Sequence, residues 1–106
     1  MNDLVEDEID VSRALALVKA GKSIFVWIGG WATTPLADLL EIDGDKVVEA
    51  NPFDLMENYP EELKSYDKPI FVCHHGIASY EVINELKEKG INGYSLAGGI
   101  EEIKKR

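Results

Sequence analysis

The sequence predicts an α/β fold in which helices flank a central, mostly parallel sheet. Two apolar runs, Ile24–Ile28 and Ile70–Cys73, are continuous rather than alternating, as expected of parallel strands covered on both faces. Segments with helical periodicity separate the predicted strands, which requires right-handed crossover connections. The 106 residues suffice for one modest core, so we expect a single domain over residues 1–106.

Local signals in the first half predict where its elements begin and end. Asp10 or Ser12 caps a first helix, which Gly21 stops. Pro35 suits the first turn of a second, short helix. The elements expected here are the helix with the apolar face Val11, Ala14, Leu15 and Val18, the strand Ile24–Ile28, the helix Pro35–Leu40 and the strand Lys46–Ala50.

The second half continues the alternation of helices and strands. Pro60 opens a short helix, the breaker pair Lys68-Pro69 precedes a buried strand, and Gly90 stops the helix after it. There is no internal repeat and no linker. The elements expected here are the helix Glu61–Tyr66, the strand Ile70–Cys73, the helix Ser79–Lys89, the strand Tyr94–Leu96 and, after Gly98-Gly99, a last helix through Ile100 and Ile103.

Charge and composition exclude several classes of partner. The formal net charge of −9 argues against nucleic acids and anionic membranes, which bind basic patches. The longest apolar stretch, Ile24–Ala32, is too short to span a membrane, and the acidic start Met1–Glu8 lacks the basic residues of a secretory signal. A single cysteine leaves no internal disulfide and fits a reducing compartment. We therefore expect a cytoplasmic protein.

The only cysteine and both histidines form one tripeptide, Cys73-His74-His75, between a predicted strand and a predicted helix. Open α/β sheets bind ligands beyond the carboxyl ends of their strands, so Cys73 is a candidate nucleophile. A thiol reacts as thiolate, which needs a source of stabilisation. Backbone N–H groups in a turn at Gly76 and the positive end of the following helix supply it. The Ser79 hydroxyl either caps that helix or reaches into the loop.

Simpler interpretations apply to the same residues. A cysteine that ends a core strand is often only a small apolar side chain. His74 and His75 are candidate general acids, hydrogen-bond donors or plain loop residues, and we expect at most one to face a ligand. A structural zinc site needs about four ligands at spaced positions, whereas these three are adjacent. We therefore expect neither a metal nor another cofactor.

The run Cys73-His74-His75-Gly76-Ile77-Ala78-Ser79 resembles the Cys-x-x-Gly-x-x-Ser active-site loop of the single-domain rhodaneses, a sulfurtransferase family. Gly90–Leu96 and Ala97-Gly98-Gly99 resemble the family's approach to its last strand and the Gly-Gly after it. The resemblance implies a rhodanese-like three-layer fold and ping-pong sulfur transfer through a Cys73 persulfide. It implies that the sulfur donor is a small sulfane compound. The acceptor that it implies is either cyanide or a thiol, and the thiol can belong to a small molecule or to a protein. The substrate-binding loop that it implies consists of His74, His75, Gly76, Ile77, Ala78 and Ser79.

The first half departs from the family's pattern. Trp27-Ile28-Gly29-Gly30 stands where members usually carry an Asp and Arg pair, and Ala78 stands where many have a loop arginine. We therefore expect slow turnover of thiosulfate. A related fold hosts phosphatases with arginine six residues after the cysteine, but here that residue is Ser79, so phosphate chemistry is not expected. The remaining alternative is a rhodanese-like binding or regulatory module whose thiol is not turned over.

Overall fold

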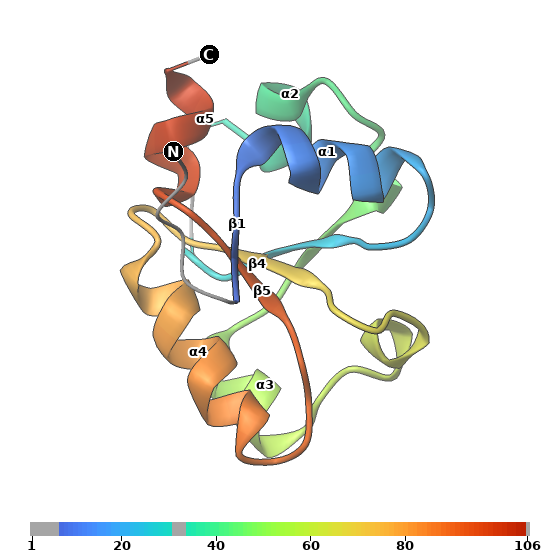
Figure 1. Ribbon diagram of the computed structural model, residues 1–106, viewed down its shortest axis with the longest axis vertical. Coiled ribbons are helices and arrows are strands. Elements are labelled where there is room, and N and C mark those ends of the chain that lie inside the picture. The colour runs from blue at the N-terminus through green and yellow to red at the C-terminus, as the bar shows by residue number, and fades with distance from the viewer. Residues whose placement is uncertain (1–6, 31–33, 106) are drawn as a thin grey trace.

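The structure, a computed structural model, describes residues 7–30 and 34–105 (Figure 1). Helices and strands alternate along the chain, as the sequence predicts. Within the described part, no helix is both long and apolar enough to cross a membrane. The elements are β1 (Glu8–Ile9), α1 (Val11–Lys19), β2 (Phe25–Trp27), α2 (Leu36–Leu40), the 3₁₀ helix η1 (Gly44–Lys46), β3 (Val47–Glu49), α3 (Pro52–Glu57), the 3₁₀ helix η2 (Glu61–Ser65), β4 (Ile70–Val72), α4 (Ile77–Lys87), β5 (Tyr94–Leu96) and α5 (Gly99–Lys104).

The strands form one parallel sheet in the order β1-β5-β4-β2-β3. At its centre β4 lies between β2 and β5, and Ile70 is in register with Phe25 and with Tyr94. Both predicted apolar runs are therefore central strands, which confirms the parallel sheet. Because every strand runs the same way, the loops that follow β2, β4 and β5 leave the same edge of the sheet.

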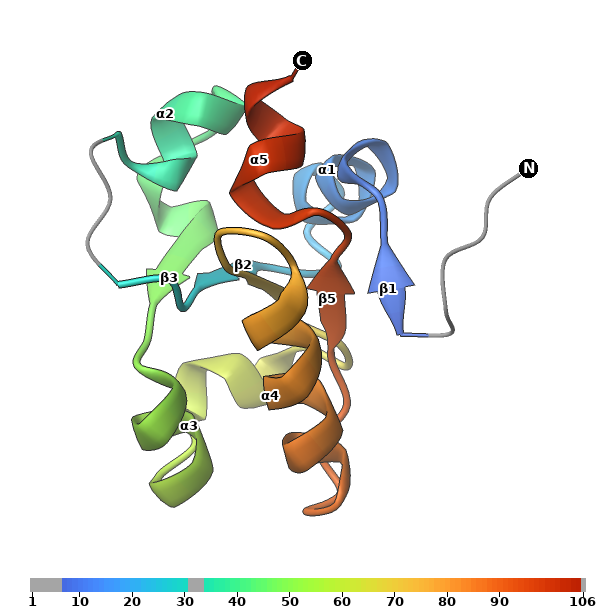
Figure 2. The same ribbon diagram turned by 90° about the vertical axis from the view of Figure 1, so that its left-hand side faces the viewer.

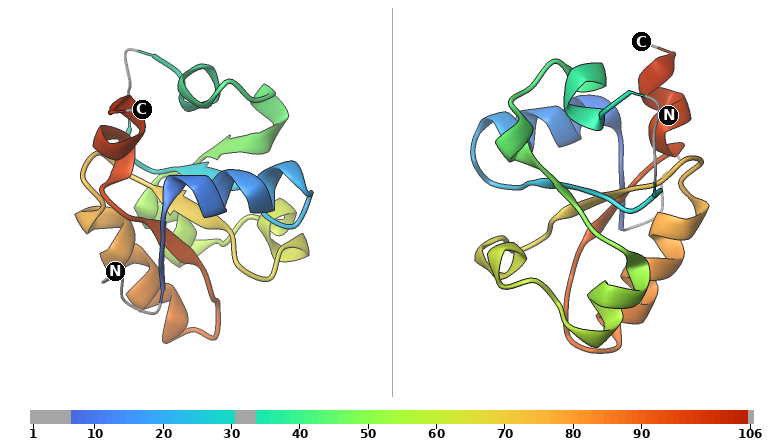
Figure 3. Two further views of the ribbon diagram at one scale, coloured as in Figure 1. Left: turned by 45° about the horizontal axis from the view of Figure 1, so that its top comes forward. Right: turned by 180° about the vertical axis from the view of Figure 1, so that it is seen from behind.

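Helices cover both faces of this sheet, which gives three layers (Figures 2 and 3). Helices α1, α2 and α5 lie on one face, and α3 and α4 lie on the other. Alternate strand residues serve the two cores, since successive side chains of a strand point to opposite faces. The first core includes Phe25, Trp27, Ile70, Val72 and Leu96. The second includes Ile24, Val26, Ile28, Phe71 and Cys73, so the cysteine side chain points toward α4.

Several predicted boundaries were wrong. The helix after Cys73 begins at Ile77 rather than Ser79, and the short helix expected over Glu61–Tyr66 is a 3₁₀ helix that ends at Ser65. Three elements were missed, β1, η1 and α3. Strand β1 is only two residues long, too short to show a pattern, and it depends on pairing with β5. Helix α3 has a single fully buried residue, Leu55, so it too shows no apolar stripe.

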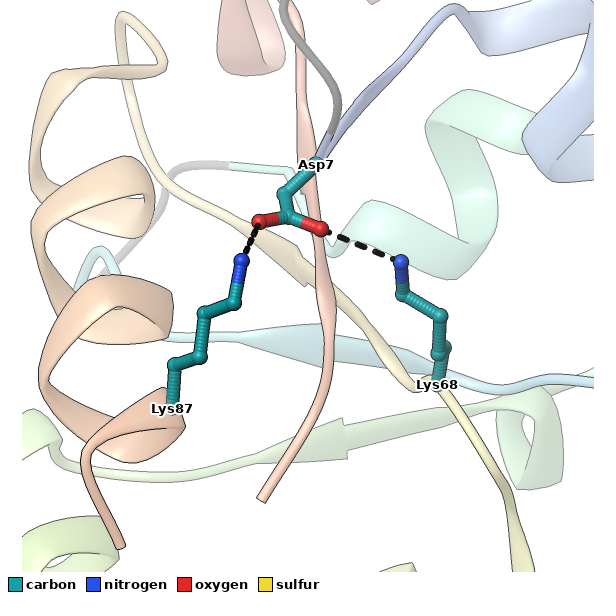
Figure 4. A network of polar contacts seen from close by, with 3 residues as sticks. All are labelled: Asp7, Lys68 and Lys87. Carbon is teal, nitrogen blue, oxygen red and sulfur yellow. Dashed lines mark hydrogen bonds and ion pairs between the residues drawn. The ribbon is translucent and has the colours of Figure 1, made fainter. Parts of the chain in front are cut away.

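An ionic cluster holds the beginning of β1 against the rest of the domain (Figure 4). We use that name for Asp7, Lys68 and Lys87. The Asp7 carboxylate lies 3.1 Å from Lys68 Nζ and 3.0 Å from Lys87 Nζ. The Lys68 ammonium also lies 4.1 Å from the centre of the Tyr94 ring, a cation–π contact. These contacts tie together the amino ends of the strands, opposite the Cys73 loop.

Candidate active site

The loop between β4 and α4 is very short. The strand ends at Val72, Cys73 follows, and helix α4 begins at Ile77 with Gly76 as its N-cap. Gly76 has φ of +86°, a left-handed conformation that favours glycine. A Cβ at Gly76 would lie 2.8 Å from the backbone nitrogen of Gly98 and 3.2 Å from the carbonyl oxygen of Leu96. Glycine is therefore required here both by conformation and by space.

Three hydrogen-bonding groups converge on the Cys73 sulfur. The backbone N–H groups of Gly76 and Ser79 donate to Sγ over 3.1 and 3.3 Å. The Ser79 hydroxyl oxygen lies 3.3 Å from the same atom. Since Ser79 occupies the first turn of α4 without capping it, its hydroxyl reaches into the loop, which is one of the two arrangements expected from the sequence. We call Cys73, Gly76, Ser79 and Ser95, which bonds to Ser79, the thiol cluster.

The thiol cluster shifts the acidity of Cys73. Burial of the thiol, which is 3% exposed, raises its pKa. Hydrogen bonds from the Ser79 hydroxyl and from the backbone amides of Ser79, Gly76 and His75 outweigh burial, so the pKa of Cys73 lies below its ordinary value. An apolar side chain here would leave buried donors unsatisfied, at about 1–3 kcal/mol each. Cys73 is therefore not simply a small apolar residue of the core.

Helix α5 fixes the loop from the other side. The N–H of Ile100 donates to the Cys73 carbonyl over 2.8 Å, and the N–H of Glu101 donates to the His74 carbonyl over 3.2 Å. A Cβ at Gly99 would overlap the Cys73 carbonyl oxygen and lie 2.8 Å from the Gly76 nitrogen. The Gly98-Gly99 pair thus lets the start of α5 meet the loop backbone directly. Two segments that are far apart in the sequence together determine the position of the thiol.

The two histidines have different surroundings. His74 Nε2 lies 3.0 Å from the Gly29 carbonyl oxygen, and its ring meets the Trp27 ring edge-on with centroids 5.1 Å apart. His74 thereby joins the Cys73 loop to the end of β2. The His75 ring lies 6.4 Å from the His74 ring, and both side chains are exposed. The role of either histidine toward a ligand stays a prediction.

The rim of the site at the start of α4 carries no charge. Its first turn contains Ile77, which is 69% exposed, and Ala78, which is also exposed. Neither an acidic nor a basic side chain stands beside them in that turn. Among the described residues, no group of three histidine, cysteine, aspartate or glutamate side chains is arranged to hold a metal ion. Neutral donors therefore surround Sγ, and they favour its thiolate form.

A comparison with solved structures finds the same fold. The chain is similar to a rhodanese homolog from the extremely thermophilic bacterium Thermus thermophilus, with a TM-score of 0.66 and 18% sequence identity. The match covers 90% of this chain and 98% of that chain. No protein-family model matches the sequence, and no curated protein matches it. The domain therefore has the three-layer α/β fold of a rhodanese homolog.

Proposed function

We propose that this protein is a rhodanese-type sulfurtransferase or sulfur carrier, which passes sulfane sulfur through a persulfide on Cys73. The observation that carries the proposal is the convergence of the Gly76 amide, the Ser79 amide and the Ser79 hydroxyl on the chain's only thiol. This arrangement favours the thiolate, which is the nucleophilic form. The rhodanese-like fold supports the same activity.

In the first half-reaction, the Cys73 thiolate attacks the outer sulfur of a sulfane donor. A new S–S bond forms at Sγ while the donor's own bond to that sulfur breaks. The leaving group departs with the electron pair: with thiosulfate it is sulfite, and with a persulfide donor it is a thiolate. Nucleophilic catalysis of this kind divides the transfer into two easier steps.

In the second half-reaction, an acceptor thiolate or cyanide attacks the outer sulfur of the Cys73 persulfide. The new bond forms on the acceptor, the S–S bond at Cys73 breaks, and its electron pair returns to Sγ. The acceptor leaves as a persulfide or as thiocyanate. The amides of Gly76 and Ser79 then stabilise the regenerated thiolate, because charge-assisted hydrogen bonds are stronger than neutral ones.

The surroundings of the thiol suggest which donors suit it. The exposed rim at Ile77 and Ala78 offers no positive charge, and the whole chain has a net charge of −9. Both features disfavour a small dianion such as thiosulfate. A donor with less charge, or a persulfide presented by a partner protein, fits this rim better. His74 and His75 stand at the exposed side of the loop, where such a donor would approach.

Intact mass spectrometry tests the proposal. Incubation with a sulfane donor, followed by removal of the donor, is expected to add the mass of one sulfur atom, which a reducing agent removes. Cys73→Ser and wild type alkylated beforehand are expected to gain nothing. If the wild-type mass stays unchanged with thiosulfate, a low-molecular-weight persulfide and a protein persulfide, the sulfurtransferase proposal is wrong. The alternative, a rhodanese-like binding or regulatory module, would then account for the domain.

A further inference from the structure

A second buried serine stands behind Ser79. Ser95 lies in β5, and its side chain points toward α4 because its neighbours Tyr94 and Leu96 belong to the core on the opposite face. Both serines are fully buried. Their hydroxyl oxygens lie 2.6 Å apart, and Ser95 Oγ lies 3.5 Å from the carbonyl oxygen of Gly76. A continuous chain of polar atoms thus runs from Cys73 Sγ through two hydroxyls to a backbone carbonyl.

A hydroxyl in this strand calls for an explanation. Ser95 is in register with the buried apolar Phe71 of β4 on one side and with Glu8 of the edge strand β1 on the other, and Leu96 follows it in β5. A buried hydroxyl costs free energy unless it is hydrogen-bonded, whereas alanine would fill the site without that cost. The short contact with Ser79 removes the penalty. Ser95 therefore forms part of a polar network that has the thiol at its other end.

Counting protons shows that the network has two states. When Cys73 is a thiol, its S–H donates to Ser79, the Ser79 O–H donates to Ser95, and the Ser95 O–H points to the Gly76 carbonyl. When the thiol proton has left to water, the Ser79 O–H donates to Sγ and the Ser95 O–H donates to Ser79. The thiolate state uses only the contact between Ser79 and Sγ and the contact between Ser95 and Ser79. The first of these is a charge-assisted hydrogen bond, because Sγ is then an anion. The thiol state needs the 3.5 Å contact, which is at the limit for a hydrogen bond.

We propose that Ser95 is a positioning residue for Cys73, which orients the Ser79 hydroxyl toward Sγ and thereby favours the thiolate. Ser95 itself does not touch the sulfur and acts only through Ser79. Consecutive hydrogen bonds polarise one another, so a donation from Ser95 strengthens the donation from Ser79 to the anion. The inference rests on the proposed function in one respect, namely that Cys73 works as a thiolate.

Charged groups near the loop act on every variant alike. On the loop itself these are the imidazoles of His74 and His75. From α5 they are the carboxylates of Glu101 and Glu102 in its first turn, and from β1 the carboxylate of Glu8, which is in register with Ser95; the first turn of α4 has none. The carboxylates oppose a thiolate and the imidazoles support it when protonated. Because replacing a neutral serine changes none of these charges, a comparison of serine variants isolates the hydroxyl network.

The experiment measures the rate of Cys73 alkylation against pH in the resting protein, without any sulfur donor. Ser95→Ala is expected to raise the midpoint by about half a unit to one unit, which lowers the thiolate fraction about three- to tenfold at pH values below the midpoint. Ser95→Thr keeps a hydroxyl and is expected to retain the wild-type midpoint. Ser95→Val has the shape of threonine without the hydroxyl and is expected to behave as Ser95→Ala does.

Two comparisons separate positioning from general destabilisation. Ser23 is also buried, and its hydroxyl donates to the Lys68 carbonyl over 2.8 Å, away from the thiol cluster. Ser23→Ala is therefore the matched control, because it also removes a buried, hydrogen-bonded serine hydroxyl. It is expected to lower thermal stability without moving the midpoint of Cys73 alkylation. Because Ser95 acts through Ser79, the double variant Ser79→Ala with Ser95→Ala is expected to match Ser79→Ala alone.

The proposal is overturned if Ser95→Ala keeps the wild-type midpoint, if Ser23→Ala shifts it equally, or if the shifts of the two single variants at Ser79 and Ser95 add in the double variant. A shifted midpoint in a protein that takes up no sulfur would support this inference while refuting the proposed function. The alkylation midpoint therefore tests the role of Ser95, and sulfur uptake separately tests the proposed function.

Discussion

The thiol cluster and the ionic cluster, at opposite ends of the sheet, stabilise negative charge in different ways. At the carboxyl end, the thiol cluster surrounds Sγ with neutral amides and hydroxyls, and its four residues are buried. At the amino end, the ionic cluster places the Asp7 carboxylate between two ammonium groups whose side chains are 30% and 52% exposed. The thiol cluster offers positioned dipoles to a thiolate at Sγ, whereas the ionic cluster holds a carboxylate by opposite charges on partly exposed side chains.

This difference has consequences for what each cluster can do. Exposed ion pairs contribute only about 0–1 kcal/mol, because water and salt screen them. Buried dipoles that already point at an anion need no rearrangement when the charge appears, and solvent screens them little. The ionic cluster thus suits modest structural reinforcement, whereas the thiol cluster suits the stabilisation of a reactive anion.

We expect the greatest loss of stability from a side chain added at Gly99, where the start of α5 packs against the backbone of the Cys73 loop. Gly99 has φ of +61°, and a Cβ there would meet the Cys73 carbonyl and the Gly76 nitrogen. Gly99→Ala is expected to lower the free energy of unfolding by about 2–4 kcal/mol, because both atoms belong to backbone that cannot move aside. Urea denaturation measures this loss.

Gly90 provides the matched control for Gly99. Its φ is +81°, but no atom of the residues that the structure describes lies within 4 Å of the position of its Cβ. Gly90→Ala therefore carries the conformational strain without the crowding, and we expect it to cost about 1 kcal/mol. Equal losses at the two positions would mean that close packing of α5 against the Cys73 loop contributes nothing.

A positive charge added at the uncharged start of α4 would give the thiol cluster the kind of group that it lacks and the ionic cluster has. Ala78 is exposed in the first turn of α4, so Ala78→Arg is expected to fold normally. A hydrogen bond to a charged group contributes about 1.5–3 kcal/mol, so persulfide formation from thiosulfate is expected to rise roughly ten- to a hundredfold. Added salt is expected to reduce the gain.

Ala78→Gln is the uncharged control for that variant, with a long polar side chain and no guanidinium. It is expected to leave the rate with thiosulfate near that of wild type. Should Ala78→Arg fold and yet match Ala78→Gln, missing charge is not what limits thiosulfate. The donor would then be selected by shape or by a partner protein.

The smallest expected effect belongs to the ionic cluster. Asp7→Asn is expected to lower the free energy of unfolding by about 0.5–1 kcal/mol, and less at high salt. The hydrogen bond from Lys87 lowers the pKa of Asp7, partial burial opposes it, and Lys68 reinforces it, so the pKa lies below its ordinary value of 3.8. A carboxyl with a lowered folded-state pKa stabilises the protein above its unfolded pKa and loses that contribution as the pH falls.

Chemical denaturation across pH checks this expectation. The stability difference between wild type and Asp7→Asn should persist above pH 3.8 and vanish as the pH falls below it through the folded-state pKa of Asp7. A difference that is unchanged at high salt, or that grows on acidification, would contradict the assignment of Asp7 to a screened ionic cluster.

The sequence predicted what depends on short-range patterns. Strands β2 and β4 lie within the continuous apolar runs Ile24–Ile28 and Ile70–Cys73, which local hydrophobicity reveals. The position of the thiol at the end of a central strand followed from the same pattern. The sequence left two arrangements open for the Ser79 hydroxyl, which could cap the helix or reach into the loop. The structure shows the second, with the hydroxyl in contact with Sγ.

What the sequence missed depends on tertiary contacts. Ser95 lies sixteen residues after Ser79, and the packing of α4 against β5 brings the two hydroxyls together. The bond from the Ile100 amide to the Cys73 carbonyl likewise requires α5 to meet the loop. One local signal did exist for Ser95, since it is a polar residue between Tyr94 and Leu96 in an expected strand.

The pH dependence of Cys73 alkylation, compared between the folded protein and the same protein unfolded in urea, shows whether the fold favours the thiolate. The thiol cluster predicts a lower midpoint in the folded state, because amides of Gly76 and Ser79 and the Ser79 hydroxyl stabilise the thiolate more than burial opposes it. A folded-state midpoint equal to or above that of the unfolded protein would contradict the account.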